Sequence, residues 1–261
     1  MQQEIKDKFP SWCQDTDTHY QLVLSDDIDS LFSCIILNYM FDYKIKFFYN
    51  FKSYYVGDNA THGKCIGVDA DLINNRRCWG NHVTLQNDNS ANLNTIMNIS
   101  KNNYTEKYCG STLLTILSYY NCTYLSNLTE EAKMILLCID STFLGYWFKE
   151  GYYCKKYLKL LEFDELIEVL ERHTKQEFED LNYKYNLKSK IYIGEDKQLH
   201  TSIKLDKLGE LFPKLSFVLP KMEFKKYHDF KIVQSSYLQH TEDKIFSCAR
   251  TYRNALRYSI I

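Results

Sequence analysis

The sequence has 261 residues, of which 45% are hydrophobic and 25% are charged, and its net charge is −1. This composition is ordinary for a globular protein. The balanced charge argues against a protein that covers nucleic acid or a membrane surface through an overall positive charge. No apolar run approaches the ~18 residues of a membrane span, and the polar segment 1–10 does not resemble a signal peptide. The nine cysteines, odd in number and without a C-x-x-C pair, predict reduced core residues in a cytoplasmic protein without a membrane partner.

The first half of the chain alternates short apolar runs with segments of helical length. After a polar lead-in, the patterns predict strands at 20–24, 44–49 and 63–68, and helices at 29–41, 93–99, 109–120 and 132–139. Asn127 or Thr129 is a suitable N-cap for the last of these helices. Alternation of this kind, with acidic residues at the ends of the elements, indicates a parallel α/β domain.

The pattern changes after residue 148. Helices are predicted at 157–161 and 164–181, followed by short strands at 191–193, 199–203, 217–219, 230–233, 245–248 and 258–261. We therefore predict a parallel-sheet domain over 1–148, a helical connector over 149–186 and a smaller α+β domain over 187–261.

Asp27 and Asp29 follow a short apolar run and precede a segment of helical length. In an extended segment, alternate side chains point the same way, so the two carboxylates can face one point. Carboxylates held so close repel each other unless a cation or a proton lies between them. The plainer alternative is an acidic helix N-terminus, where Asp residues interact favourably with the helix dipole.

Several short motifs in 18–148 resemble, in order and approximate spacing, those of the DHH phosphoesterase superfamily, a group of metal-dependent hydrolases of nucleotides, oligonucleotides and pyrophosphate. The matching segments are Asp27-Ile28-Asp29-Ser30, Cys65-Ile66-Gly67-Val68-Asp69, Gly80-Asn81-His82 or Asn81-His82-Val83, Gly110-Ser111-Thr112 and Ile139-Asp140-Ser141-Thr142. The resemblance implies a DHH-like fold and one or two Mn²⁺ (or Mg²⁺) ions.

The resemblance also implies roles for individual residues. Asp69 would bridge two metals and act in catalysis together with His82. Asp27 would serve the first metal, while Asp29, His82 and Asp140 serve the second. Val23 and Ser25 stand where relatives carry further ligands, so the first metal needs a substitute. The candidates for that substitution are Asp26, Asp71, His19 and Asn81.

Two groups of these candidates have plainer explanations. His82, close to Trp79 in sequence, can be a hydrogen-bonded core residue. Arg250, Arg253 and Arg257 are spaced for one side of a helical turn and are the candidates for gripping phosphate, but a solvated face explains the same spacing.

The sequence thus favours an enzyme, a divalent-metal-dependent phosphoesterase acting on a small nucleotide, a cyclic dinucleotide or a short oligonucleotide. The alternative is a catalytically degenerate DHH-fold protein that binds a nucleotide or a partner protein without hydrolysis. A structural protein with a coincidental acid pattern and a homodimer are both compatible with the sequence.

Overall fold

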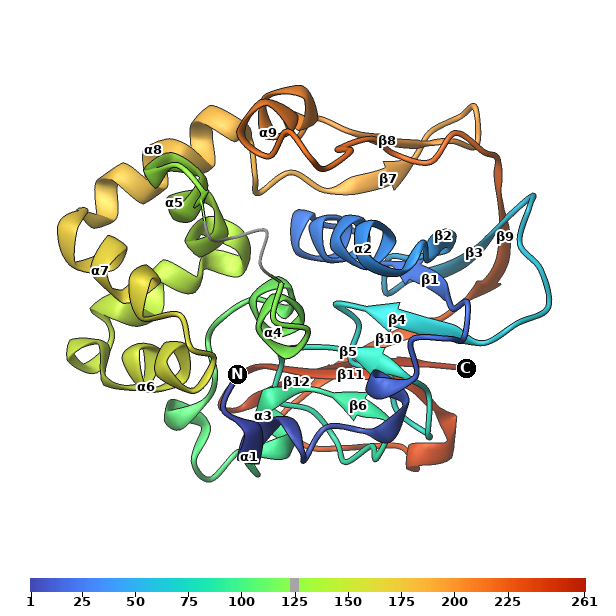
Figure 1. Ribbon diagram of the computed structural model, residues 1–261. Helices are drawn as coiled ribbons and strands as arrows, with labels where there is room; N and C mark the ends of the chain where they lie inside the picture. Colours follow the sequence, from blue (N-terminus) through green and yellow to red (C-terminus); the bar gives the residue numbers. More distant parts are fainter. Residues whose placement is uncertain (123–126) are drawn as a thin grey trace.

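Strand β1 (Gln21–Leu24) lies inside a large, mostly parallel sheet, which the computed structural model shows together with several helices and smaller antiparallel sheets (Figure 1). The structure describes residues 1–122 and 127–261. The parallel neighbours of β1 are β2 (Lys44–Tyr49) and β4 (Cys65–Val68). The sheet continues in parallel beyond β4 through β5 (Cys78–Trp79) and β6 (Ser90–Ala91), and in antiparallel pairing beyond β2 through β3 (Ser53–Gly57) and β9 (Phe224–Asp229). The mixed α/β class predicted from the sequence is therefore correct.

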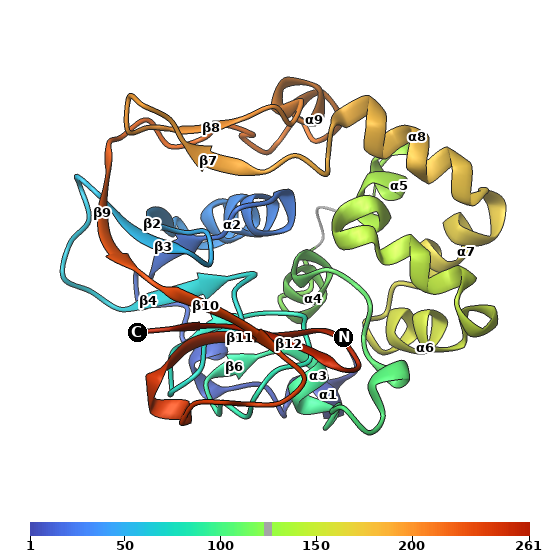
Figure 2. The same cartoon turned by 180° about the vertical axis from the view of Figure 1, so that it is seen from behind.

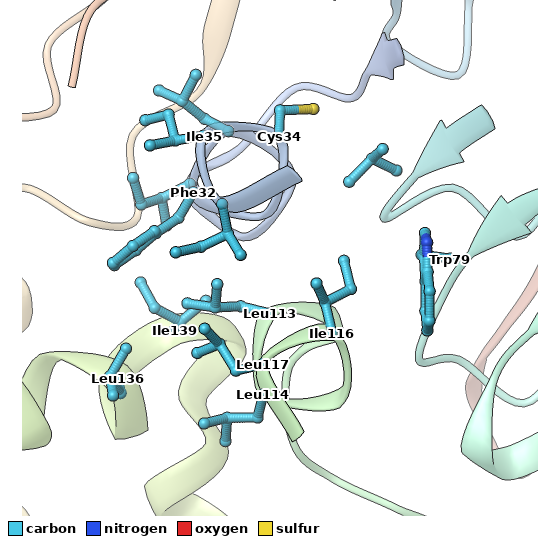
Figure 3. Close-up of a cluster of buried hydrophobic side chains, with 14 of the residues drawn as sticks. Phe32, Cys34, Ile35, Trp79, Leu113, Leu114, Ile116, Leu117, Leu136 and Ile139 are labelled. Atoms are coloured by element: carbon cyan, nitrogen blue, oxygen red, sulfur yellow. The ribbon is translucent and has the colours of Figure 1, made fainter. Parts of the chain in front are cut away.

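Side chains of β1 alternate between two hydrophobic cores. Leu22 and Leu24 point into the main core, and Val23 points to the other face of the sheet. Helices α2 (Ile28–Phe41) and α4 (Thr112–Tyr119) lie side by side over the main core (Figure 3). Each is started by a side chain, because Asp27 accepts a hydrogen bond from Ser30 N and Ser111 accepts one from Leu114 N.

The main core is built from leucine, isoleucine and aromatic side chains of these two helices and their neighbours (Figure 3). Phe32 from α2 and Leu113, Ile116 and Leu117 from α4 are at most 1% exposed. Burial of one such side chain contributes about 1.5–3 kcal/mol, so this contact fixes the two helices on the sheet.

A group of helices lies beside the sheet and α4 (Figures 1 and 2). Its members are α5 (Glu130–Cys138), η4 (Ile139–Trp147), η5 (Lys149–Gly151), α6 (Tyr152–Leu160), α7 (Asp164–Arg172) and α8 (Lys175–Tyr185). Thr129 is the N-cap of α5, as one of the two predicted alternatives has it. The single helix predicted over 164–181 is wrong, because Thr174 and Glu177 form a capping box that starts a new helix after His173.

The last part of the chain covers two sides of the large sheet. Near α2 lie β7 (Ile191–Ile193), β8 (Leu199–Thr201) and α9 (Leu205–Leu211), and the last of these was not predicted (Figure 1). A three-stranded antiparallel sheet of β10 (Lys231–Ser235), β11 (Ile245–Tyr252) and β12 (Ala255–Ile260) packs near β4 on the other side (Figure 2). The short elements that remain are α1 (Gln3–Lys6), η1 (Ser11–Gln14), α3 (Leu93–Ile96), η2 (Tyr104–Glu106) and η6 (Glu242–Lys244).

The strand predicted at 217–219 is not a strand. Phe217 instead packs its ring against Phe32, with 4.7 Å between ring centroids, so its apolar character serves the core. Because β9 pairs with β3, the large sheet takes one strand from the segment after residue 186. The domain boundaries at 148 and 186 stay predictions. Within the described residues, no helix is both long and apolar enough to cross a membrane.

Candidate functional site

The sequence-predicted acidic residues meet where the order of the parallel strands reverses. The connection after β1 leads through α2 to β2 on one side, whereas β4 lies on the other side of β1. Ser30 ties the two strand ends together, since its Oγ accepts from Ser25 N at 2.7 Å and donates to Val68 O at 2.6 Å. In open α/β sheets, ligands bind at the carboxyl ends of strands at such a reversal.

Asp29 is buried and faces the N-terminus of α4. Its two carboxylate oxygens accept hydrogen bonds from Thr112 N and Leu113 N, each at 2.8 Å. Backbone N–H groups at a helix start favour a negative charge. Burial nevertheless raises the pKa of Asp29 well above its usual value, and the charges of Asp140 and Asp27 raise it further.

Asp69 follows β4 directly and has a left-handed backbone, with φ of 52°. Its Oδ1 accepts a hydrogen bond from Thr112 Oγ1 at 2.8 Å. Burial raises the pKa of Asp69 strongly, and the charges of Asp29, Asp27 and Asp140 add to the rise. The buried carboxylates after β1 and β4 are therefore close enough to oppose each other's ionisation.

Asp140 reaches the same place from the junction of α5 and η4. Residues Asp140 and Ser141 both have positive φ there, which turns the chain between the two helices. Asp140 is exposed as a residue, but its carboxylate accepts a hydrogen bond from the buried Asn81 Nδ2 at 2.7 Å. Desolvation by the surrounding protein raises the pKa of Asp140, while the charge of His82 acts in the opposite direction.

His82 is held by Asp71. Its Nδ1 lies 2.9 Å from Asp71 Oδ2, and the other oxygen of Asp71 accepts from Asn92 Nδ2 at 2.7 Å. Burial lowers the pKa of His82, but the hydrogen bond and charge of Asp71 outweigh this and raise that pKa to about 9. His82 is therefore protonated at neutral pH and adds a positive charge near Asp140.

A lysine that the sequence analysis did not select lies beside the acids. Lys190 Nζ is 2.9 Å from Asp26 Oδ1 and 3.2 Å from Asp27 Oδ2. Burial lowers the pKa of Lys190, but the charges of Asp27 and Asp26 outweigh this effect and raise it. Two of the predicted carboxylates thus already have a cationic partner from the segment just before β7.

Asp27, Asp29 and Asp140 share a cavity of about 170 Å³ with Lys188, Lys190 and Asn182. Asn182 is only 4% exposed, and its Nδ2 has no hydrogen-bond partner within the described residues. A buried amide left without a partner costs free energy, so this donor indicates room for a ligand oxygen in the cavity. The lysines and Asn182 come from α8 and the turn after it, which the sequence could not place beside Asp27.

The acidic side chains are of the type that binds a divalent cation, but they are not arranged as a complete metal site. Oxygen donors are those that Mg²⁺ and Mn²⁺ prefer. Burial, and after it the neighbouring carboxylates, raises the pKa of Asp29 and Asp69. Among the described residues, however, no three His, Cys, Asp or Glu side chains are arranged to hold a metal ion. The oxygen donors therefore suit one hard cation, but they do not form a complete coordination shell in this structure.

The other candidates lie elsewhere or are already engaged. His19 is exposed at the amino end of β1, the end opposite to the acids. Asn81 donates to Asp140 and to Gly110 O, so its amide nitrogen is already used.

The helical turn predicted for the three arginines is wrong. Arg250 is on β11 and Arg257 on β12, with Arg253 at the hairpin between them. Arg250 pairs in register with Leu256, and Arg257 pairs with Ala249. Since neighbouring residues of a strand point to opposite faces, Arg250 and Arg257 lie on opposite faces of the hairpin.

Comparison with known proteins found no match to a family model, to a curated protein or to a solved structure.

Proposed function

We propose that this protein is a divalent-cation-dependent phosphoesterase of the DHH type. Its substrate class would be a small nucleotide, a cyclic dinucleotide or a short oligonucleotide. The observation that carries the proposal is the meeting of Asp29, Asp69 and Asp140 at the reversal of strand order. Burial raises the pKa of each, and the charges of neighbouring aspartates, among them Asp27, raise each pKa further. Structural carboxylates seldom gather in this way without a cation to bind.

Asp29, Asp69 and Asp140 would hold one Mn²⁺ or Mg²⁺ ion. Such an ion lowers the pKa of a bound water and offsets the charge of a phosphoryl group. Lys188 and Lys190 line the same cavity and supply positive charge for that phosphoryl group, and Asn182 Nδ2 supplies a neutral donor. His82, held in its protonated form by Asp71, is the candidate to give a proton to the leaving oxygen.

A second candidate function is nucleotide binding without hydrolysis. Two ion pairs favour it, Lys190 with Asp27 and His82 with Asp71, because each occupies a side chain that the DHH resemblance assigns to a metal. A protein of this kind would bind one cation or none.

The distinguishing experiment measures turnover and affinity together. Wild type would be assayed in Mn²⁺ against a linear dinucleotide, a cyclic dinucleotide and pyrophosphate, and ligand binding would be followed by calorimetry. Turnover that EDTA abolishes supports the phosphoesterase. Binding of a dinucleotide without turnover supports the second candidate, and neither turnover nor binding contradicts both.

We also propose that the protein is cytoplasmic. The cysteines form no disulfide within the described residues, which supports a reducing compartment such as the cytoplasm.

A further inference from the structure

A second cavity, of about 630 Å³, lies on the other face of the large sheet from α2 and α4. Val23 of β1 and Gly67 of β4 form its floor, and Phe246 of β11 faces them from the antiparallel sheet. It shares no described lining residue with the cavity that holds Asp27, Asp29 and Asp140. Its volume is within the range of roughly 300–1,000 Å³ that is usual for small-molecule sites.

Aromatic rings form one wall of this second cavity. Phe230 and Phe246 stack with 4.6 Å between centroids and 28° between planes. Tyr54 meets Phe246 edge to face at 5.9 Å, and Tyr227 in turn meets Tyr54 at 6.5 Å. Tyr227 is 78% exposed, so it stands at the rim with most of its ring uncovered. Such a wall offers ring surface to a planar aromatic ligand.

Two arginines and a histidine line the cavity beside these rings. They are Arg76, Arg77 and His228, whose ring centroid lies 4.6 Å from that of Phe230, and the described lining contains no carboxylate side chain. The Arg76 guanidinium lies 4.9 Å from the Phe246 ring centre, and its Nη1 donates to Ile73 O at 3.0 Å. A guanidinium has five N–H donors, so this one bond leaves several of them for a ligand.

Among these side chains, Arg77 Nε and His228 Nε2 are buried without a hydrogen-bond partner in the described part of the chain. Arg77 Nε–H is a donor, and a donor that is removed from water and left unpaired costs free energy, which an anionic ligand would recover. Stacking rings and unpaired guanidinium donors together match one chemical class, a planar aromatic ring that carries an anionic group.

We propose that the second cavity binds a nucleoside monophosphate, with its base on the exposed ring of Tyr227 and its phosphate on the side of Arg76 and Arg77. Bases stack on aromatic side chains and guanidinium groups bind phosphate with two parallel hydrogen bonds in many proteins. The proposal is independent of the acidic site, because it needs neither a divalent cation nor Asp69.

The test is calorimetric titration of the full chain in EDTA with AMP, GMP, CMP and UMP, and with adenosine and ribose 5-phosphate as part-ligands. We expect at least one nucleotide to bind, and both part-ligands to bind at least about tenfold more weakly, because each lacks one of the two interactions. Ribose 5-phosphate binding as well as the nucleotide would overturn the stacking role of the rings. Adenosine binding as well as AMP would overturn the role of the arginines, and no binding of any nucleotide at millimolar concentration would overturn the proposal.

Variants locate the binding within the molecule. Arg76→Gln and Tyr227→Ala should each weaken nucleotide binding about tenfold or more. Their matched controls, Lys175→Gln on α8 and Tyr237→Ala, change the same charge or ring at exposed residues outside the cavity and should bind as wild type does. Because Tyr227 is mostly exposed, its removal leaves the fold intact even if Arg76→Gln does not fold. Asp69→Asn should bind the nucleotide normally in EDTA, and a loss there would move the binding to the acidic site and overturn the proposal.

Discussion

Replacing Asp69 by asparagine separates the effect of its charge on stability from its proposed role in binding a metal ion. Asn is nearly isosteric and tolerates the left-handed backbone at this position, where φ is 52°. Its side-chain oxygen can still accept the hydrogen bond of Thr112 Oγ1. The substitution therefore removes one charge from a buried group of carboxylates and little else.

The expected change in stability depends on pH and on metal. In EDTA at about pH 8, ionised Asp69 is opposed by burial and by the charges of Asp29, Asp27 and Asp140. Each pKa unit of such opposition is equivalent to about 1.4 kcal/mol, so Asp69→Asn should raise the free energy of unfolding by about 1 kcal/mol or more. The gain should vanish near pH 4, where the wild-type carboxyl group is protonated in the folded protein.

With bound metal, wild type should become more stable than Asp69→Asn. At about 100 times its dissociation constant, one bound cation stabilises wild type by about 2.7 kcal/mol, and the variant should gain much less. If the protein hydrolyses a phosphoester, Asp69→Asn should lower the rate on the order of a thousandfold, equivalent to about 4 kcal/mol of transition-state stabilisation.

Urea denaturation with and without Mn²⁺, together with the turnover assay, measures both effects. Asp58→Asn, at an exposed position just after β3, is the matched control and should change neither quantity. A variant that is less stable than wild type in EDTA at pH 8 would refute the electrostatic reasoning. Full activity of the variant would refute the metal role of Asp69.

Three further predictions follow from the same contacts. In EDTA, the free energy of unfolding should fall as pH rises above about 4, because Asp29 and Asp69 keep protons in the folded protein that the unfolded chain has released. It should fall again between pH 6.5 and about 9, as His82 loses its proton. Denaturant titrations that show stability rising over this span would contradict the prediction. Lys190→Met should cost at most about 1 kcal/mol of stability, since the pair is partly exposed, but should tighten Mn²⁺ binding several-fold in calorimetry because it removes a positive charge beside the acidic site. Leu117→Ala should cost about 2–5 kcal/mol in a urea titration, whereas Leu144→Ala at an exposed position should cost far less.

The sequence predicted that the acids converge because they follow the ends of recognisable elements. Asp69 comes directly after β4, and Asp27 comes three residues after the end of β1. These two strands are parallel neighbours, and the carboxyl ends of parallel strands share one edge of the sheet. Asp140 joins them from the end of a helix, where the chain turns through two residues with positive φ. The prediction that the acids converge rested on the order of these elements along the chain.

The ion pairs and the arginine hairpin could not be predicted in the same way. Lys190 is more than a hundred residues from Asp27, and only the packing of the segment before β7 brings the two together. Arg250 and Arg257 have a spacing that suits a helical turn, but the β-branched and aromatic residues between and around them pair as a hairpin. Local spacing was ambiguous there, and tertiary pairing decided the outcome.

The position of Lys190 bears on how any ligand would enter the acidic site. Its ammonium group already neutralises part of the charge of Asp26 and Asp27, so a cation near Asp27 would have to displace it. A cation near Asp29 and Asp69 would not, because those carboxylates are held by Thr112 and Leu113 instead. The lysine would then remain free to turn toward a phosphoryl group in the shared cavity. The contacts therefore favour a single cation on the Asp29 and Asp69 side, with Lys190 supplying from the other side the positive charge that a second metal would supply in a two-metal site.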